Sequence, residues 1–82
     1  MFSIYVLKSL RNNKRYVGYT SKDVGLRLRE HNLGSNKFTS QNGPFVLIYT
    51  EKLLDKTSAI KREKFLKSGQ GRKFLDNVTS PP

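Results

Sequence analysis

Glu63 is a carboxylate in an unexpected position for a helix. In TSAIKREKFLKSG (residues 57–69), Ala59, Ile60 and Leu66 follow the spacing of an apolar helical stripe. At about 100° per residue, Glu63 lies about 40° from Ala59 and therefore in the middle of that stripe. Every other charged residue of the segment is basic, so the carboxylate should stay ionised, as a hard divalent cation requires. The pattern indicates a metal ligand, and the alternative is a surface charge paired with a lysine.

Arg27 and His31 are four residues apart and share one face of a predicted helix. Val24 and Leu28 lie on the same side, which directs the pair toward the rest of the fold. A guanidinium there could bind a phosphate bidentately, with the imidazole beside it for proton transfer or a hydrogen bond. The alternative is a pair of surface side chains with buried stems.

Two tyrosines and one glycine-rich segment complete the candidates. Tyr5 and Tyr16 lie on the two arms of a predicted hairpin, where tyrosines most often serve as packing residues. The segment GQGRK (residues 69–73) places backbone N–H groups and two cations at a helix start. This arrangement suits a phosphate, although a simple helix break explains it equally well.

Composition narrows the class of protein. Sixteen Lys and Arg against six Asp and Glu give a formal net charge of +10, which favours a polyanionic partner, most often nucleic acid. A basic domain without such a partner is the alternative. The absence of cysteine and the single histidine exclude a disulfide framework and disfavour structural zinc. The N-terminal apolar run is too short for a signal peptide or membrane span. We therefore expect a cytoplasmic protein with no membrane partner.

A hairpin must position the two tyrosines. FSIYVLKS (residues 2–9) and RYVGYT (residues 15–20) are rich in β-branched and aromatic residues and predict two strands. Asn12 and Asn13 between them tolerate positive φ and predict the turn. Gly18 interrupts the second strand, which indicates a bulge or a close backbone approach.

Helices and one further strand must position the other candidates. We expect a helix over 21–34, begun by Ser21 or Asp23 and ended by Gly34, then a polar loop over 35–44 and a strand over 44–51. That strand is apolar on both faces, which is typical of a central or doubly covered strand. The Glu63 helix should begin after Asp55 or Thr57, break at 68–71 and be followed by a short helix over 71–78. The chain is long enough for one small domain. We predict a single α+β domain over 1–78, of order ββαβαα, and a disordered tail over 79–82.

In this order, the motifs resemble those of the GIY-YIG nuclease family, and especially its small single-domain bacterial members. The resemblance extends from Ser3 to about Phe74. The matching segments are SIY (Ser3, Ile4, Tyr5), YVG (Tyr16, Val17, Gly18), LRLREHN with Arg27 and His31, PFVLIYTE, and AIKREKFLK with Glu63. Ser3 stands where the family has glycine, and Val17 where it has isoleucine.

The resemblance implies a fold and an activity. The fold would be a central three-stranded antiparallel sheet flanked by helices. The activity would be metal-dependent hydrolysis of DNA phosphodiesters, such as nicking of branched or damaged DNA. The implied catalytic residues are Tyr5, Tyr16, Arg27, His31 and Glu63. Glu63 would hold a single Mg²⁺ or Mn²⁺, Arg27 would bind the scissile phosphate, and a tyrosine or His31 would help activate water.

We expect DNA as the partner, with RNA as the alternative, and a monomer that cuts one strand. Further nucleic-acid contacts are predicted at Lys14, Arg29, Lys37, Lys67, Arg72 and Lys73. Two other functions stay open at this point. The chain could be a module that binds nucleic acid without cutting it, or an accessory subunit of a larger repair or recombination protein.

Overall fold

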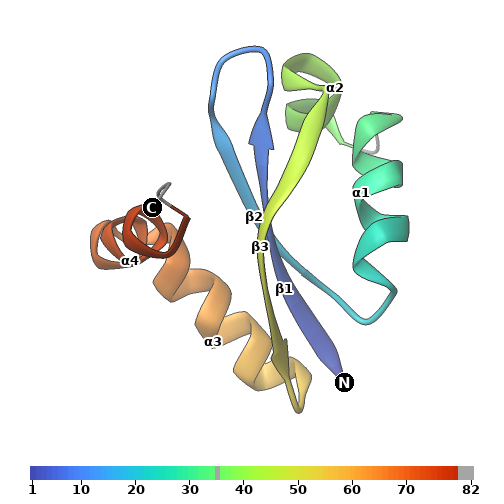
Figure 1. Cartoon of the computed structure of the whole chain (residues 1–82). Coiled ribbons are helices and arrows are strands. Elements are labelled where there is room, and N and C mark those ends of the chain that lie inside the picture. The colour runs from blue at the N-terminus through green and yellow to red at the C-terminus, as the bar shows by residue number, and fades with distance from the viewer. Residues whose placement is uncertain (35, 80–82) are drawn as a thin grey trace.

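The fold is a three-stranded antiparallel sheet with two helices on each face, seen in a computed structural model that describes residues 1–34 and 36–79 (Figure 1). The strand order is β2-β1-β3. The elements are β1 (Phe2–Ser9), β2 (Arg15–Thr20), α1 (Val24–Asn32), α2 (Lys37–Asn42), β3 (Phe45–Leu53), α3 (Lys56–Lys67) and α4 (Gly69–Thr79). The predicted α+β class and three-stranded sheet are confirmed. Within the described ranges, no helix has the length and apolar character needed to cross a membrane.

The β1–β2 hairpin closes as the sequence predicts. Asn13 adopts a positive φ of 63°, which asparagine tolerates better than most residues. The Ser9 backbone N–H donates to the Lys14 carbonyl at 2.8 Å and ends the ladder. The hairpin thus places Tyr5 directly opposite Gly18.

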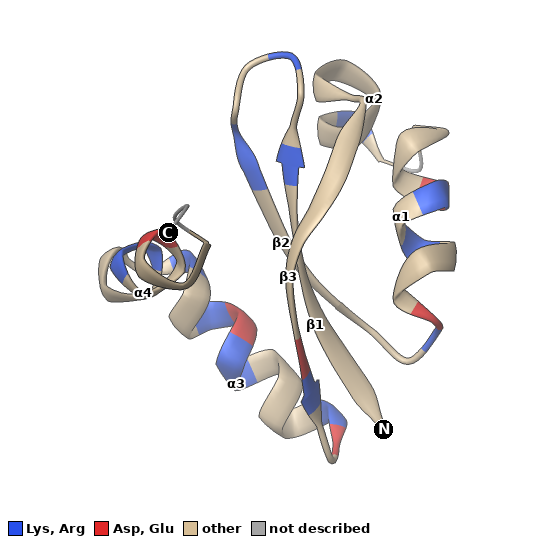
Figure 2. Ribbon diagram, in the orientation of Figure 1, with Lys and Arg blue, Asp and Glu red and all other residues tan. Residues whose placement is uncertain are grey.

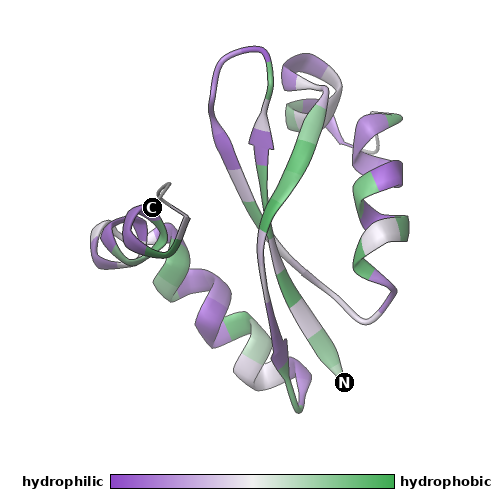
Figure 3. Ribbon diagram, viewed as in Figure 1, coloured by the Kyte–Doolittle hydropathy of each residue, from purple (hydrophilic) through white to green (hydrophobic). Residues whose placement is uncertain are grey.

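The sequence predicts a central or doubly covered strand over 44–51, and the central position is wrong, because β3 pairs only with β1 and forms an edge of the sheet. Its first half is strongly hydrophobic (Figure 3), yet Val46 and Leu47 are both more than a third exposed. The register also shifts opposite Val6 and Leu7, which marks a bulge. Apolar content on both faces of a strand therefore did not establish its place in the sheet. The central strand is β1, whose residues Ile4 to Leu7 are fully buried.

The predicted polar loop over 35–44 contains the short helix α2, which is a second correction. Asn36 begins this helix with a capping box: its side chain accepts from the Thr39 N–H at 2.9 Å, and its own N–H donates to the Thr39 hydroxyl. A reciprocal cap satisfies two otherwise unpaired donors, so a segment of six residues, five of them polar, forms a helix. Ser35 lies outside the described residues.

The other helix ends mostly follow the predicted caps. Asp23, not Ser21, caps α1 by accepting from the Leu26 N–H, and Gly34 follows the helix with a φ of 83°. Asp55 caps α3 by accepting from the Ser58 N–H at 2.8 Å.

The break between α3 and α4 is shorter than predicted. It is confined to Ser68, and α4 already begins at Gly69. Gly71 makes this tight junction feasible, since a side chain there would collide with the α3 backbone at Phe65 and Leu66. At the other end α4 includes Thr79, one residue past the predicted domain boundary, and residues 80–82 of the predicted tail lie outside the described residues.

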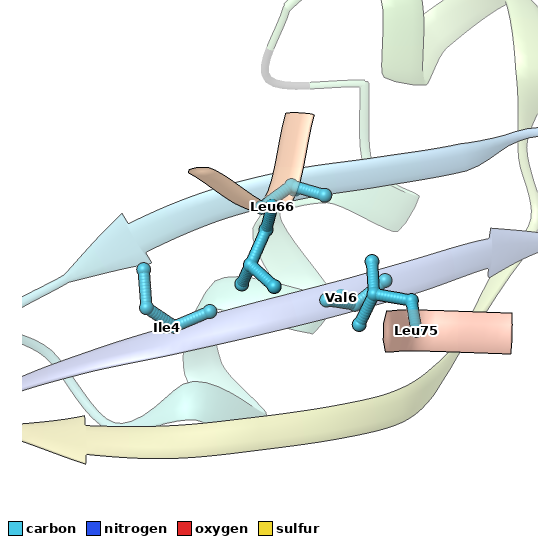
Figure 4. Packing of buried hydrophobic residues seen from close by; sticks show 5 residues of the cluster. Ile4, Val6, Leu66 and Leu75 are labelled. Atoms are coloured by element: carbon cyan, nitrogen blue, oxygen red, sulfur yellow. The ribbon is translucent and has the colours of Figure 1, made fainter. Parts of the chain in front are cut away.

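Alternating side chains of β1 supply two separate cores. Ile4 and Val6 point toward α3 and α4, where they pack with Leu66 and Leu75 (Figure 4). Burying an aliphatic side chain of this size contributes about 1.5–3 kcal/mol. On the other face, which α1 and α2 cover, Tyr5 packs in a second cluster with Leu7, Phe45, Tyr16, Val24, Leu28 and Phe38. Tyr5 and Glu63 therefore start from opposite faces of the sheet.

Candidate active site

Tyr5 is the centre of the candidate site. Its side chain is fully buried, and its hydroxyl lies 2.8 Å from His31 Nε2. The ring crosses β2 at Gly18, where an added Cβ would lie only 2.5 Å from the Tyr5 hydroxyl oxygen. The close approach that the sequence indicated at Gly18 is confirmed. Glycine is needed there because it leaves room for the phenol to reach the outer edge of β2.

Helix α1 contributes Arg27 and His31 on the face that meets the sheet, as their spacing predicts. His31 is completely buried. Burial, followed by the nearby Arg27 charge, lowers the pKa of His31 below its ordinary 6.5. The imidazole is therefore neutral at physiological pH. Arg27 Nη1 donates to Glu30 at 2.8 Å, which orients the guanidinium from one side.

The pKa of Tyr5 links residues from both faces of the sheet. It is raised to about 12, mainly by burial and then by Tyr16, and the negative charge of Glu63 adds to the rise. Hydrogen bonding and positive charge from Arg27 act in the opposite direction. A phenol with such a pKa stays protonated at neutral pH. Glu63 makes the smallest of these contributions.

Glu63 lies on the partly buried side of α3, as the helical spacing predicts. Its side chain is 21% exposed, and Lys67 Nζ is 3.7 Å from one carboxylate oxygen. No cluster of three or more His, Cys, Asp or Glu side chains exists within the described ranges. A single carboxylate nevertheless fits Mg²⁺, which prefers oxygen ligands and usually retains several waters. The donor at this position therefore suits a hard divalent cation.

Tyr16 lies nearer to the surface than Tyr5. Its ring packs against His31 and Phe38, with centroid distances of 4.8 and 5.6 Å. Its hydroxyl accepts a hydrogen bond from Asn36 Nδ2 at 3.3 Å. The two tyrosines thus differ in access, because only Tyr16 is partly exposed.

A groove of roughly 590 Å³ runs along β2 and reaches α2, α3 and α4. Its floor is largely apolar and its rim carries four cations. The lining residues are Lys14, Arg15, Tyr16, Val17, Phe38, Leu66, Lys67, Arg72 and Leu75. A basic rim over a groove beside Tyr16 suits a phosphodiester chain.

The predicted nucleic-acid contacts divide into two groups. Lys14, Lys67 and Arg72 line the groove. The others, Arg29, Lys37 and Lys73, are exposed on the described surface without lining it.

Sequence reasoning missed three residues of the site. Arg15 lines the groove and pairs with Asp76 of α4 at 2.9 Å. Its position beside Lys14 at a strand start was a usable signal. Glu30 follows Arg27 by three residues, a spacing at which helical side chains meet. Asn36 carried no signal beyond its cap, because its contact with Tyr16 is long-range.

A second polar cluster lies outside the site, between β3 and the α3–α4 pair. Arg62 donates from Nε and Nη2 to the Glu51 carboxylate at 2.8–3.1 Å, and the Tyr49 hydroxyl donates to the same carboxylate. The guanidinium also packs on Phe65 and Phe74, 5.0 and 4.9 Å from their ring centroids. This cluster connects three elements.

Comparison with known proteins agrees with this geometry. Residues 1–75 match the family model of the GIY-YIG catalytic domain. A UPF0213 protein of Staphylococcus haemolyticus is 36% identical over 66 residues, which is 79% of this chain and 78% of that protein. A UPF0213 protein of Staphylococcus aureus is 36% identical over 73 residues, covering 88% and 87% of the two chains. The solution NMR structure of a UPF0213 protein from Bacillus halodurans matches with a TM-score of 0.58 and 30% identity, covering 100% of this chain and 89% of that one.

Proposed function

Because the chain belongs to the GIY-YIG catalytic domain family, we propose that it is a divalent-metal-dependent endonuclease that hydrolyses DNA phosphodiester bonds. The observation that carries the proposal is the groove along β2, which is lined by Tyr16 and by Lys67, the ion-pair partner of Glu63. The helix that carries the carboxylate thus borders the same groove as the Tyr16 phenol, and Tyr16 packs on His31 of the helix that carries Arg27. Such a combination suits phosphoryl transfer, which depends on positioning and on cations around the reacting phosphate.

The cation would be held by Glu63. Mg²⁺ is the preferred ion because it takes one or two carboxylates, and Mn²⁺ is the alternative. When bound, it would stabilise the charge that develops on the phosphate. Lys67 pairs with Glu63 at 3.7 Å and also lines the groove. Because its side chain is largely exposed, it could turn away from the carboxylate and further into the groove.

Arg27 would bind the scissile phosphate. Its planar guanidinium offers five N–H donors, of which Glu30 uses one at 2.8 Å and the Tyr5 hydroxyl accepts another. These two contacts hold the group in place and leave donors for a phosphate oxygen. Preorganised donors of this kind stabilise charge that develops in the transition state.

The two tyrosines receive different roles. Tyr5 is buried, protonated and hydrogen-bonded to His31. Arg27 can only donate, so the phenolic oxygen accepts from it, and the same hydroxyl shares a hydrogen bond with His31 Nε2 at 2.8 Å. Tyr5 thus positions both α1 residues. Tyr16 lines the groove and would orient the attacking water through its hydroxyl oxygen.

The test is cleavage of DNA by the purified chain. Supercoiled plasmid and a branched oligonucleotide are incubated with Mg²⁺, with Mn²⁺ and with EDTA, beside Glu63→Gln and the surface control Lys52→Gln. We expect nicking that requires the metal, is lost in Glu63→Gln and is retained in Lys52→Gln. Nicking by Glu63→Gln at the wild-type rate would overturn the proposal.

The same experiment separates the two alternatives. Salt-sensitive DNA binding that survives EDTA and Glu63→Gln, without any cleavage, would identify a binding module. Absence of both binding and cleavage would instead point to an accessory subunit that depends on another protein.

A further inference from the structure

The end of the β1–β2 hairpin, residues 8–15, carries positive charge only; we call it the basic hairpin. It contains Lys8, Arg11, Lys14 and Arg15, and the first acidic residue of the chain is Asp23. Figure 2 shows blue and no red along this end of the hairpin. Such a concentration of one sign of charge on a projecting element is suited to a polyanion.

Two of these cations face each other across the strands. Lys8 is the direct register partner of Arg15, and like charges in directly opposite positions destabilise a sheet. Asp76 of α4 relieves part of this repulsion by pairing with Arg15. The arrangement is unfavourable for folding alone, and an anionic ligand would relieve it.

The basic hairpin is also fixed against α2 by hydrogen bonds. Asn12 Nδ2 donates to Asn42 Oδ1 at 2.7 Å, and the buried Ser9 hydroxyl donates to the Asn42 carbonyl at 2.6 Å. Arg11 Nη1 donates to the Gln41 carbonyl at 3.1 Å. The turn lies beside α2 in Figure 1. These contacts hold the turn in one place, which reduces the entropy that binding would cost.

The basic hairpin is continuous with the groove of the candidate site. Lys14 and Arg15 belong to the groove lining as well as to the hairpin, whereas Arg11 extends the positive surface beyond it. A phosphodiester chain that occupies the groove would therefore meet these cations as it leaves the site along β2.

We propose that the basic hairpin is a second binding site of this protein, which holds the sugar–phosphate backbone of the nucleic acid outside the active site. The inference rests on the proposed function for the nature of the ligand. Contacts to phosphates fix register and orientation without reading sequence. The hairpin would thus determine where a longer substrate lies relative to Glu63, and it would contribute nothing to a substrate too short to reach it.

The test is the salt dependence of DNA binding, measured in EDTA so that no cleavage occurs. A labelled duplex of about 20 base pairs is titrated with wild type, the double variant Arg11→Gln/Lys14→Gln, and Lys52→Gln as control. Each phosphate contact contributes about 0.9 to the slope of log K against log salt. We expect the double variant to lose about 1.8 from the slope and the control to match wild type.

A variant that changes no charge tests the contact between the basic hairpin and α2 separately. Asn42→Ala removes the side-chain acceptor for Asn12 and leaves every charge in place. We expect binding weakened about threefold to tenfold with the wild-type slope, because the cations remain but are no longer held. The residues changed in the double variant and in Lys52→Gln are exposed, so thermal melting should show that both proteins fold.

The possible failures are distinguishable. If wild type and Arg27→Ala bind the duplex differently but the double variant has the wild-type slope, the basic hairpin is no binding site and the proposed function stands. If wild type binds neither this duplex nor a single strand of the same length at low salt, the proposed function fails and the inference fails with it.

Discussion

The two faces of the sheet each carry a tyrosine–arginine network, and the networks differ in the third group. Toward α3 and α4, Tyr49 and Arg62 converge on the Glu51 carboxylate. Toward α1, Tyr5 contacts both Arg27 and the His31 imidazole, which burial keeps neutral. The Glu51 carboxylate thus neutralises Arg62 within its network, whereas Arg27 has its carboxylate partner, Glu30, on its own helix.

The surroundings of the two arginines reinforce this difference. Arg62 is held by bidentate contacts and lies between two phenylalanine rings. Arg27 makes one 2.8 Å contact with Glu30, a carboxylate that Lys22 also shares at 3.1 Å. A cation matched by a bidentate carboxylate of its own stabilises the fold, and a cation that shares its carboxylate with a lysine retains charge that can attract an anion. The comparison therefore assigns stability to one face and phosphate binding to the other.

The strongest way to break this comparison is to remove each arginine in turn. We expect Arg27→Ala to lower the DNA cleavage rate by about 10²–10³-fold, the cost of losing one preorganised charge-stabilising group. Arg62→Ala should change the rate per folded molecule by less than about threefold. Its contacts with Glu51, Phe65 and Phe74 all lie outside the site. Single-turnover cleavage under saturating protein measures both, and equal losses would contradict the division between the faces.

Gly18 tests whether Tyr5 must lie over β2. An added Cβ in Gly18→Ala would lie 2.5 Å from the Tyr5 hydroxyl oxygen, so the phenol must move. We expect the free energy of unfolding to fall by about 1–3 kcal/mol, as for other overpacked cores. Cleavage should also fall, because Tyr5 would no longer hold Arg27 and His31. Urea denaturation gives the first quantity, with Gly69→Ala as the control, since nothing lies within 4 Å of a Cβ at that position. Equal stability of the two variants would refute the close packing.

Arg62 sharpens the comparison in terms of stability. Arg62→Ala should lower the free energy of unfolding by about 2 kcal/mol, since it removes a partly buried ion pair and two cation–π contacts. Arg27→Ala should cost less than about 1 kcal/mol, because its pair with Glu30 is more exposed. Chemical denaturation of both variants provides the measurement. A larger loss in Arg27→Ala would reverse the roles that we assign.

His31 gives the smallest effect, a pH dependence of stability. The pKa of His31 is lowered in the folded protein, so the unfolded chain binds a proton more readily. The stability from the neutral buried imidazole is therefore complete above pH 6.5 and is lost as pH falls through the folded pKa. Urea midpoints of wild type and His31→Gln, measured from pH 7.5 to pH 5, should converge as the pH falls. Parallel curves would show that His31 does not titrate in this way.

Local signals in the sequence predicted most of the fold. Asn13 in the turn, Asp23 and Asp55 at the helix starts and Gly34 at a helix end all have the predicted roles. Each depends on contacts within a few residues, which a sequence reading can evaluate. The place of β3 and the helix α2 were missed, because pairing order depends on distant strands and the cap of α2 depends on a reciprocal contact.

The candidate site was predictable to a smaller extent. Helical spacing correctly placed Glu63 on the partly buried side of α3, and Arg27 with His31 on one face of α1. The bonding of Tyr5 to His31 spans 26 residues and has no local signal. The same is true of Arg62 and Glu51, which meet across two elements. Which arginine has a carboxylate of its own and which shares one therefore required the structure.

The central claim is that Glu63 and Tyr5, carried on opposite faces of the sheet, share one metal-dependent site. The most direct measurement is the NMR spectrum of the labelled Tyr5 ring at neutral pH, titrated with Mg²⁺. In wild type the Tyr5 resonances should shift as the ion neutralises the nearby carboxylate. In Glu63→Gln they should ignore the ion. Tyr5 resonances that Mg²⁺ leaves unchanged in both proteins would contradict the account.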